Sequence, residues 1–169
     1  MSRADAAARD LIDRFGFTDL PIDPEKVARE LGVLVIRESG DARLSGMLLR
    51  RDGQMAIGLN PQHSATGQRF ALAHLLGHFH MHRGRELLLD TVDRYSYGNL
   101  PSMPTDREGA EANRFAGALL APEAVVRRMA AEARFDTAAQ LVGILAGRFE
   151  LSPAVMSYRL MSLGIIMDA

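Results

Sequence analysis

The spacing of apolar residues changes at Ser64, and this change restricts the fold more than any other feature of the sequence. Residues 33–59 contain three short apolar runs with the composition of strands, and Asp52-Gly53 between the last two is a strong hairpin signal. From Ser64 to Met81 apolar side chains recur at helical intervals, which predicts a helix. The chain therefore combines a small, mostly antiparallel sheet with helices that lie apart from it in sequence, and the predicted fold class is α+β.

The other helices are predicted from apolar periodicity and from residues typical of helix ends. Asp23 followed by Pro24 begins a short helix that stops before Gly32. The predicted helices span residues 3–15, 23–31, 64–81, 106–120, 122–133, 137–149 and 152–163. The loop at 83–105 contains one short strand at Leu87–Leu89. We expect one domain over residues 1–169, divided into N-terminal helices and sheet (1–63), motif helices and loop (64–122) and closing helices (123–169).

Composition restricts the chemistry that this chain can perform. Cysteine is absent, so disulfides and thiolate metal sites are excluded, and any metal must be held by histidine and carboxylates. The net charge of -1 gives no electrostatic footprint for nucleic acid. No apolar run is long enough for a signal peptide or a membrane span, so we expect a cytoplasmic protein without a membrane partner.

Four of the five histidines lie between positions 74 and 82. On a helix, His74 and His78 lie one turn apart on one face, with Cβ atoms roughly 6 Å apart. Two imidazoles in this arrangement can hold one zinc ion, as they do in H-E-x-x-H peptidases. An isolated H-x-x-x-H pair also arises by chance on a partly buried helix, so the pair alone does not establish a metal site.

The remaining histidines are interpreted as surface or packing residues. His82 shares the face of His74 only if the helix continues, and it would then lie ~12 Å along the axis from His74, too far for one ion. His80 is expected on the opposite face of the helix, and His63 precedes the helix.

Several segments around the histidines together form a recognisable pattern. They are Ser45-Gly46, the run RFALAHLLGH at 69–78, the run ANRFAGALLAP at 112–122, and the C-terminal residues from Arg148 to Gly164. With these segments the chain resembles the ImmA/IrrE family of metallo-endopeptidases over nearly its whole length. The resemblance implies a zincin-like (gluzincin-type) domain, whose active members use zinc and cut helix-turn-helix repressors that are often encoded beside them.

The chain departs from the family pattern at two positions. The family's general base directly follows the first histidine, where this chain has Leu75; its third metal ligand lies four residues before Asn113, where this chain has Gly109. Glu108 is the nearest substitute ligand, although it points about 100° away on a helix, and Glu111 is about 200° away and predicted to face solvent. Gly109 and Asn113 are expected on a packing face of small residues, where Asn113 can hydrogen-bond.

The two departures predict weak chemistry at the site. Leucine cannot transfer a proton, and general acid–base help is worth about 10²–10⁴-fold in rate. Two histidines without a third ligand should hold zinc weakly or not at all. The first hypothesis is therefore a catalytically impaired relative that binds a repressor- or antitoxin-type helix-turn-helix protein. The alternative is an active zinc peptidase in which Glu108 completes the metal site.

A third hypothesis concerns DNA. Residues 137–163 resemble a helix-turn-helix pair, which would make the chain a DNA-binding regulator. Arg148 and Arg159 supply little positive charge there, and Glu150 offsets it, so we expect a packing role for these helices and no nucleic-acid partner. The loop at 90–105 can act as a lid or partner contact or can be inert, and the sequence leaves both open.

Overall fold

The computed structural model describes residues 1–92 and 105–167. The helices are α1 (Arg3–Phe15), α2 (Pro24–Glu30), α3 (Ala65–Met81), α4 (Asp106–Leu120), α5 (Glu123–Glu132), α6 (Ala138–Phe149) and α7 (Pro153–Ser162), and the strands are β1 (Leu34–Arg37), β2 (Leu44–Arg51), β3 (Gln54–Leu59) and β4 (Leu87–Thr91). The α+β prediction is confirmed, and each predicted helix is present within one residue of its expected ends.

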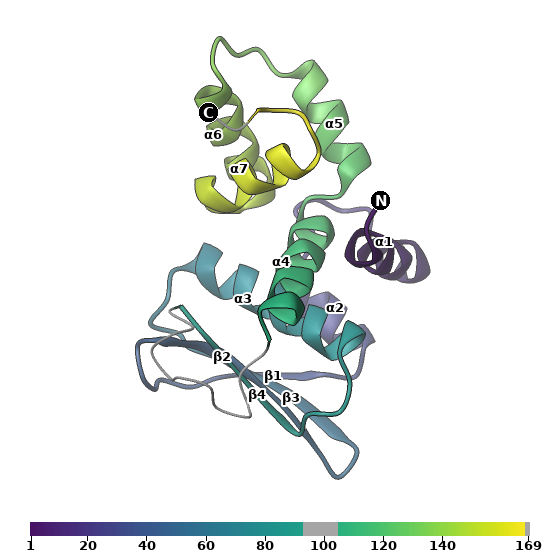
Figure 1. The fold of residues 1–169 in the computed structure, drawn as a ribbon, viewed down its shortest axis with the longest axis vertical. Coiled ribbons are helices and arrows are strands. Elements are labelled where there is room, and N and C mark those ends of the chain that lie inside the picture. The colour runs from purple at the N-terminus through teal and green to yellow at the C-terminus, as the bar shows by residue number, and fades with distance from the viewer. Residues whose placement is uncertain (93–104, 168–169) are drawn as a thin grey trace.

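Figure 1 shows the sheet at one end of the molecule and α5, α6 and α7 at the other, with α3 and α4 between them. The predicted lid or partner contact at 90–105 falls largely on residues 93–104, which lie outside the described residues.

The four strands form one sheet in the order β1-β3-β2-β4. β2 pairs antiparallel with β3 and with β4, whereas β1 runs parallel to β3, so the sheet is mostly antiparallel as predicted. The turn between β2 and β3 is made by Asp52 and Gly53, whose φ angles are 51° and 76°. Both angles are positive, as a tight two-residue hairpin requires. β4 runs to Thr91, two residues past its predicted end, and therefore includes Asp90.

The part of the core that positions the histidines lies between the sheet and α3, and between α3 and α4. Leu48 of β2, Ile57 of β3 and Leu75 of α3 are all fully buried in it. The two helices approach each other closely at Gly77, where a Cβ atom would lie 2.9 Å from Cδ1 of Phe115 and 3.3 Å from the backbone of Ala112. α4 also packs against α1 and α7, so it connects both ends of the molecule.

The C-terminal helices are joined to the N-terminus through Arg159, which is only 4% exposed. Its guanidinium donates to the Ala121 carbonyl at 3.0 Å and to the Asp5 carboxylate at 2.9 Å. Burial works to raise the pKa of Asp5, but the hydrogen bonds from Ser2 and Arg159 and the charge of Arg159 outweigh it, so that pKa is lowered.

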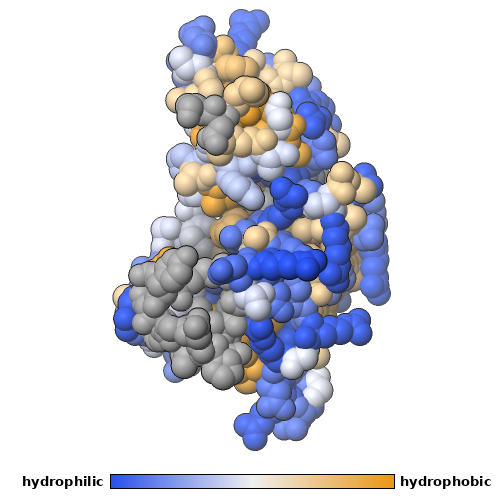
Figure 2. Space-filling view, in the orientation of Figure 1, coloured by the Kyte–Doolittle hydropathy of each residue, from blue (hydrophilic) through white to orange (hydrophobic). Residues whose placement is uncertain are grey.

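Arg159 is one of the two arginines considered for DNA contact, and it is therefore inside the fold. Figure 2 shows apolar side chains over the C-terminal helices. Within the described residues, no helix combines the length and the apolar character needed to cross a membrane.

Candidate functional site

Three histidine rings form a row along one side of α3. The Nε2 atoms of His74 and His78 are 3.1 Å apart, and the Nδ1 atoms of His78 and His82 are 3.0 Å apart. His74 is 4% exposed and His78 is fully buried. The side-by-side arrangement follows from the four-residue spacing on a helix that begins at the Ser64 N-cap. The structure thus brings the predicted His74/His78 pair together, with the nitrogens that a metal would bind facing each other.

His82 joins the row because the chain leaves the helix there. α3 ends at Met81, and His82 has an extended backbone with φ -118° and ψ 118°. Its ring turns back toward His78, and its Nε2 lies 3.0 Å from Oε2 of Glu111. The prediction that Glu111 faces solvent holds only in part, because its side chain is 25% exposed and lies between His82 and Arg107. The hydrogen bond to His82 is the largest cause of its lowered pKa. The prediction rested on the helical pattern of α4 alone, which does not show that the end of α3 lies beside Glu111.

Asp90 is a candidate site residue that the sequence analysis missed. Its Oδ1 lies 3.4 Å from His74 Nε2, and its Oδ2 accepts a hydrogen bond from Ser45 Oγ at 2.8 Å. Burial works to raise the pKa of Asp90, but the charge of His74 and the hydrogen bonds from His74 and Ser45 outweigh it, so that pKa is lowered. Its signal in the sequence is a single acidic residue directly after the predicted strand Leu87–Leu89. β4 pairs with β2 and so carries this carboxylate to the histidines.

Leu75, at the family's general-base position, belongs to the core. Its side chain is fully buried and lies against β2 at Gly46. A Cβ atom built on Gly46 would be 2.7 Å from Leu75 Cδ1 and 2.7 Å from the Gly58 carbonyl oxygen. The Ser45-Gly46 pair therefore contacts two site residues: Ser45 donates a hydrogen bond to Asp90, and Gly46 leaves the space that the Leu75 side chain fills.

The candidate residues of α4 have contacts to groups other than the histidine pair. The Glu108 carboxylate accepts from the Thr105 amide at 2.9 Å and pairs with Arg85 at 2.9 Å, which caps the helix and neutralises its charge. Gly109 is buried on the packing face, as expected. Asn113 is exposed, so its expected place in the helix interface is wrong, because this side of α4 faces two cavities.

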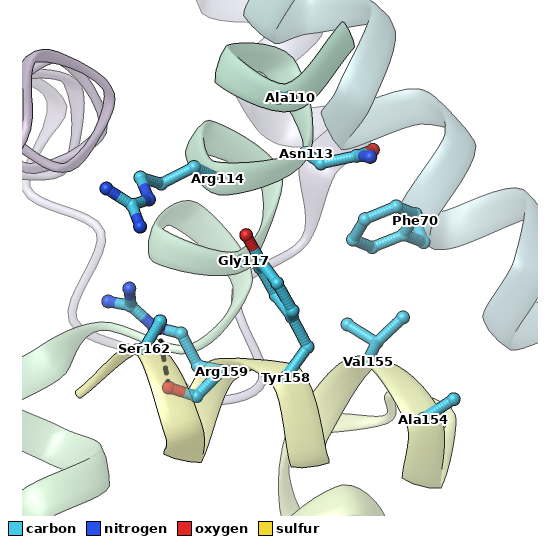
Figure 3. Close-up of a pocket in the computed structure, with 10 residues that line it drawn as sticks. All are labelled: Phe70, Ala110, Asn113, Arg114, Gly117, Ala154, Val155, Tyr158, Arg159 and Ser162. Carbon is cyan, nitrogen blue, oxygen red and sulfur yellow. Dashed lines mark hydrogen bonds between the residues drawn. The ribbon is translucent and has the colours of Figure 1, made fainter. Parts of the chain in front are cut away.

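The two cavities meet at the side chains of Phe70 and Asn113, which line both. One cavity, of about 320 Å³, opens beside His74 and Asp90 and includes Ser45 in its wall. The other, of about 340 Å³, lies between α4 and α7. Figure 3 shows Tyr158 of α7 pointing toward Gly117 of α4, with Phe70 approaching from α3. The two neighbouring cavities together extend from His74 to the C-terminal helices, and we call this pair of cavities the α4–α7 groove.

The donor groups fit part of a zinc site. Two imidazole nitrogens face each other, and a carboxylate adjoins the first of them. In the described part of the chain, no three histidine, aspartate or glutamate side chains already form a complete metal site.

A family model describing the IrrE N-terminal-like domain, peptidase family M78, matches residues 28–161. No curated protein matches the sequence. The matched segment starts in α2 and ends in α7, so it includes every strand of the sheet as well as α3 and α4. The match therefore covers all the elements that carry the histidine row, Asp90 and Leu75.

Proposed function

Because the chain belongs to the IrrE N-terminal-like (ImmA/IrrE) family of M78 peptidases, we propose that it is a member that keeps a partner-binding cleft and does not hydrolyse peptides. Its partner under this proposal is a helix-turn-helix protein of the repressor or antitoxin type. The protein would act by holding that partner, and the partner would remain intact.

The burial of Leu75 is the observation that carries this proposal. Zinc, when bound in such a site, lowers the pKa of a water molecule and polarises a carbonyl, and a carboxylate must then take the proton from that water. In this chain the residue after His74 is a leucine enclosed by the core and packed against Gly46. Loss of general acid–base help lowers the rate by about 10²–10⁴-fold.

Asp90 does not provide the missing base. Its Oδ1 lies only 3.4 Å from the metal-binding nitrogen of His74, which is the separation of two ligands on one ion. Its other oxygen already accepts from Ser45. A general base has to reach the water and stay off the metal, so this position suits a ligand better than a base.

The family's own ligand set supports weak zinc binding or none. α4 offers Gly109 at the ligand position, and Glu108 is engaged by Thr105 and Arg85. Two histidines alone leave a catalytic zinc site one protein ligand short. Any tighter binding has to come from a donor outside α4.

The groove supports the binding half of the proposal. The two cavities are of the size that binding pockets have, and they share Phe70 and Asn113 in their walls. Tyr158 is 51% exposed on its wall, and a half-exposed tyrosine is a common anchor in protein interfaces. An extended segment of a partner can lie along this groove from Asp90 toward α7.

The test mixes the full chain with the helix-turn-helix protein encoded nearest to its own gene, with and without zinc. Binding is measured by titration calorimetry, and the masses of both proteins are measured after prolonged incubation. We expect a complex in which both chains stay intact, and Tyr158→Arg should weaken it by about tenfold or more, the loss expected of an interface anchor. Leu34→Arg is the matched control, since Leu34 is 61% exposed on β1 and does not line the groove.

Two outcomes would overturn the proposal. Zinc-dependent cleavage that His74→Ala abolishes would establish the active-peptidase alternative. Equal weakening by Tyr158→Arg and Leu34→Arg would show that the α4–α7 groove is not the partner site.

A further inference from the structure

We propose that Asp90 is the third protein ligand of a divalent-metal site formed with His74 and His78, in place of the donor that α4 lacks. The inference goes beyond the proposed function, because it concerns metal binding by the chain alone and needs no partner. It places the ligand on a strand, whereas the family pattern places it on the helix after the loop.

The spacing of the donor atoms supports this site. Zinc binds histidine nitrogen and carboxylate oxygen at about 2.0–2.2 Å in a tetrahedron, so two ligand atoms on one ion are about 3.3–3.5 Å apart. His74 Nε2 is 3.1 Å from His78 Nε2 and 3.4 Å from Asp90 Oδ1. His74 therefore has a neighbour at ligand spacing on each side. Since the described residues do not yet form a complete metal site, Asp90 must turn its carboxylate toward His78 when a metal binds.

Each outer donor is oriented by a group behind it. Ser45 Oγ donates to Asp90 Oδ2, which leaves Oδ1 toward His74. His82 contacts Nδ1 of His78, and Glu111 contacts His82. Metal ligands in proteins are regularly fixed by such hydrogen bonds to their second atoms, because these bonds set the tautomer and the ring orientation.

Burial and charge also select Asp90 over the other acids. The side chains of His74 and Asp90 are 6% and 15% exposed, so a cation there would be well shielded from water. Glu108 is held by Thr105 and Arg85. Glu111 is held by His82 and Arg107 at the opposite end of the histidine row. The cavity beside Asp90 leaves room for water or a partner group at a fourth position.

The test measures metal affinity, with no assay of activity. The chelator-treated full chain is titrated with zinc against a chromophoric competitor, and with cobalt while the visible spectrum is recorded. We expect one ion per chain and a tetrahedral cobalt spectrum. Asp90→Asn should weaken zinc binding by more than the roughly 10–100-fold that loss of an outer-shell partner costs, and should change the cobalt spectrum.

Two further variants keep the test decisive. Asp90→His retains a donor and should recover most of the affinity, which also covers the case in which Asp90→Asn folds poorly. Glu108→Gln is the control and should leave the affinity unchanged. The inference is overturned if the wild-type chain binds no zinc, if Asp90→Asn binds as tightly as wild type, or if Glu108→Gln causes the larger loss. None of these results would alter partner binding, so the proposed function is tested separately.

Discussion

The two faces of α3 differ although they are built from adjacent residues. His74 and Leu75 are both buried, but His74 faces a cavity together with Asp90, whereas Leu75 packs against the sheet at Gly46. On the first face His74 Nε2 lies 3.1 Å from His78 Nε2 and 3.4 Å from Asp90 Oδ1. On the second face Leu75, at the family's general-base position, is part of the core. The difference teaches that adjacent residues of one helix can depend on different neighbours, because Leu75 packs against Gly46 whereas His74 contacts Asp90.

The most severe change places a charge on the core face of α3. Leu75→Glu should lower the free energy of unfolding at neutral pH by about 3–5 kcal/mol, the cost of an uncompensated buried charge. Burial raises the folded-state pKa of such a carboxyl above its unfolded value. The variant should therefore approach wild-type stability below the unfolded pKa and lose stability as the pH rises through the folded pKa. Urea unfolding at several pH values measures this, with Leu75→Met as the control. Wild-type stability at neutral pH would show that this face also opens to the site.

A smaller loss is expected from filling the space that Leu75 uses. Gly46→Ala should lower the free energy of unfolding by about 2–3 kcal/mol, because its Cβ atom would overlap both Leu75 and the Gly58 carbonyl. Gly40→Ala is the matched control, since a Cβ atom there meets nothing within 4 Å. Chemical denaturation of both variants measures the difference. Equal stability of the two would mean that Leu75 does not press on the strand as described.

Arg50 connects the two faces, and its loss should have an intermediate effect. This β2 side chain donates to the carbonyls of His78, Phe79 and His82 at 3.1, 3.2 and 2.7 Å, and so holds the end of α3. Arg50→Met should cost about 1.5–3 kcal/mol, the range for hydrogen bonds from a charged group. Because His82 directly follows the end of α3, its NMR signals should shift as well. Unchanged His82 signals would show that Arg50 does not connect the sheet face of α3 with the histidine row.

The mildest change is at the far end of the row. Glu111→Gln removes the charge beside His82, and its midpoint of thermal unfolding should fall only slightly, since the Glu111 side chain is 25% exposed. The pKa of Glu111 is lowered in the folded state, chiefly by the hydrogen bond to His82. Its contribution to stability is thus present above the unfolded pKa and is lost as the pH falls through the lowered folded pKa. A difference between wild type and variant that grows on acidification would contradict this assignment.

The sequence predicted what depends on neighbours close in the chain. The His74/His78 pair needs only a helix and a spacing of four, and the Asp52-Gly53 hairpin needs only its own turn residues. Asp90 was missed because its role arises from pairing β4 with β2, which brings it to a serine 45 positions away. The contact of Glu111 with His82 was missed because His82 lies beyond the end of α3, and the helical pattern of α4 does not show where another helix ends.

A zinc-bound crystal structure with anomalous scattering tests most directly whether this cleft keeps its metal-facing groups and lacks a proton-transfer carboxylate. We predict one peak bonded to His74 Nε2, His78 Nε2 and an oxygen of Asp90, with Leu75 still packed on Gly46. A peak whose bound water is hydrogen-bonded to a carboxylate, from any part of the chain, would contradict the account, as would the absence of metal from the histidine pair.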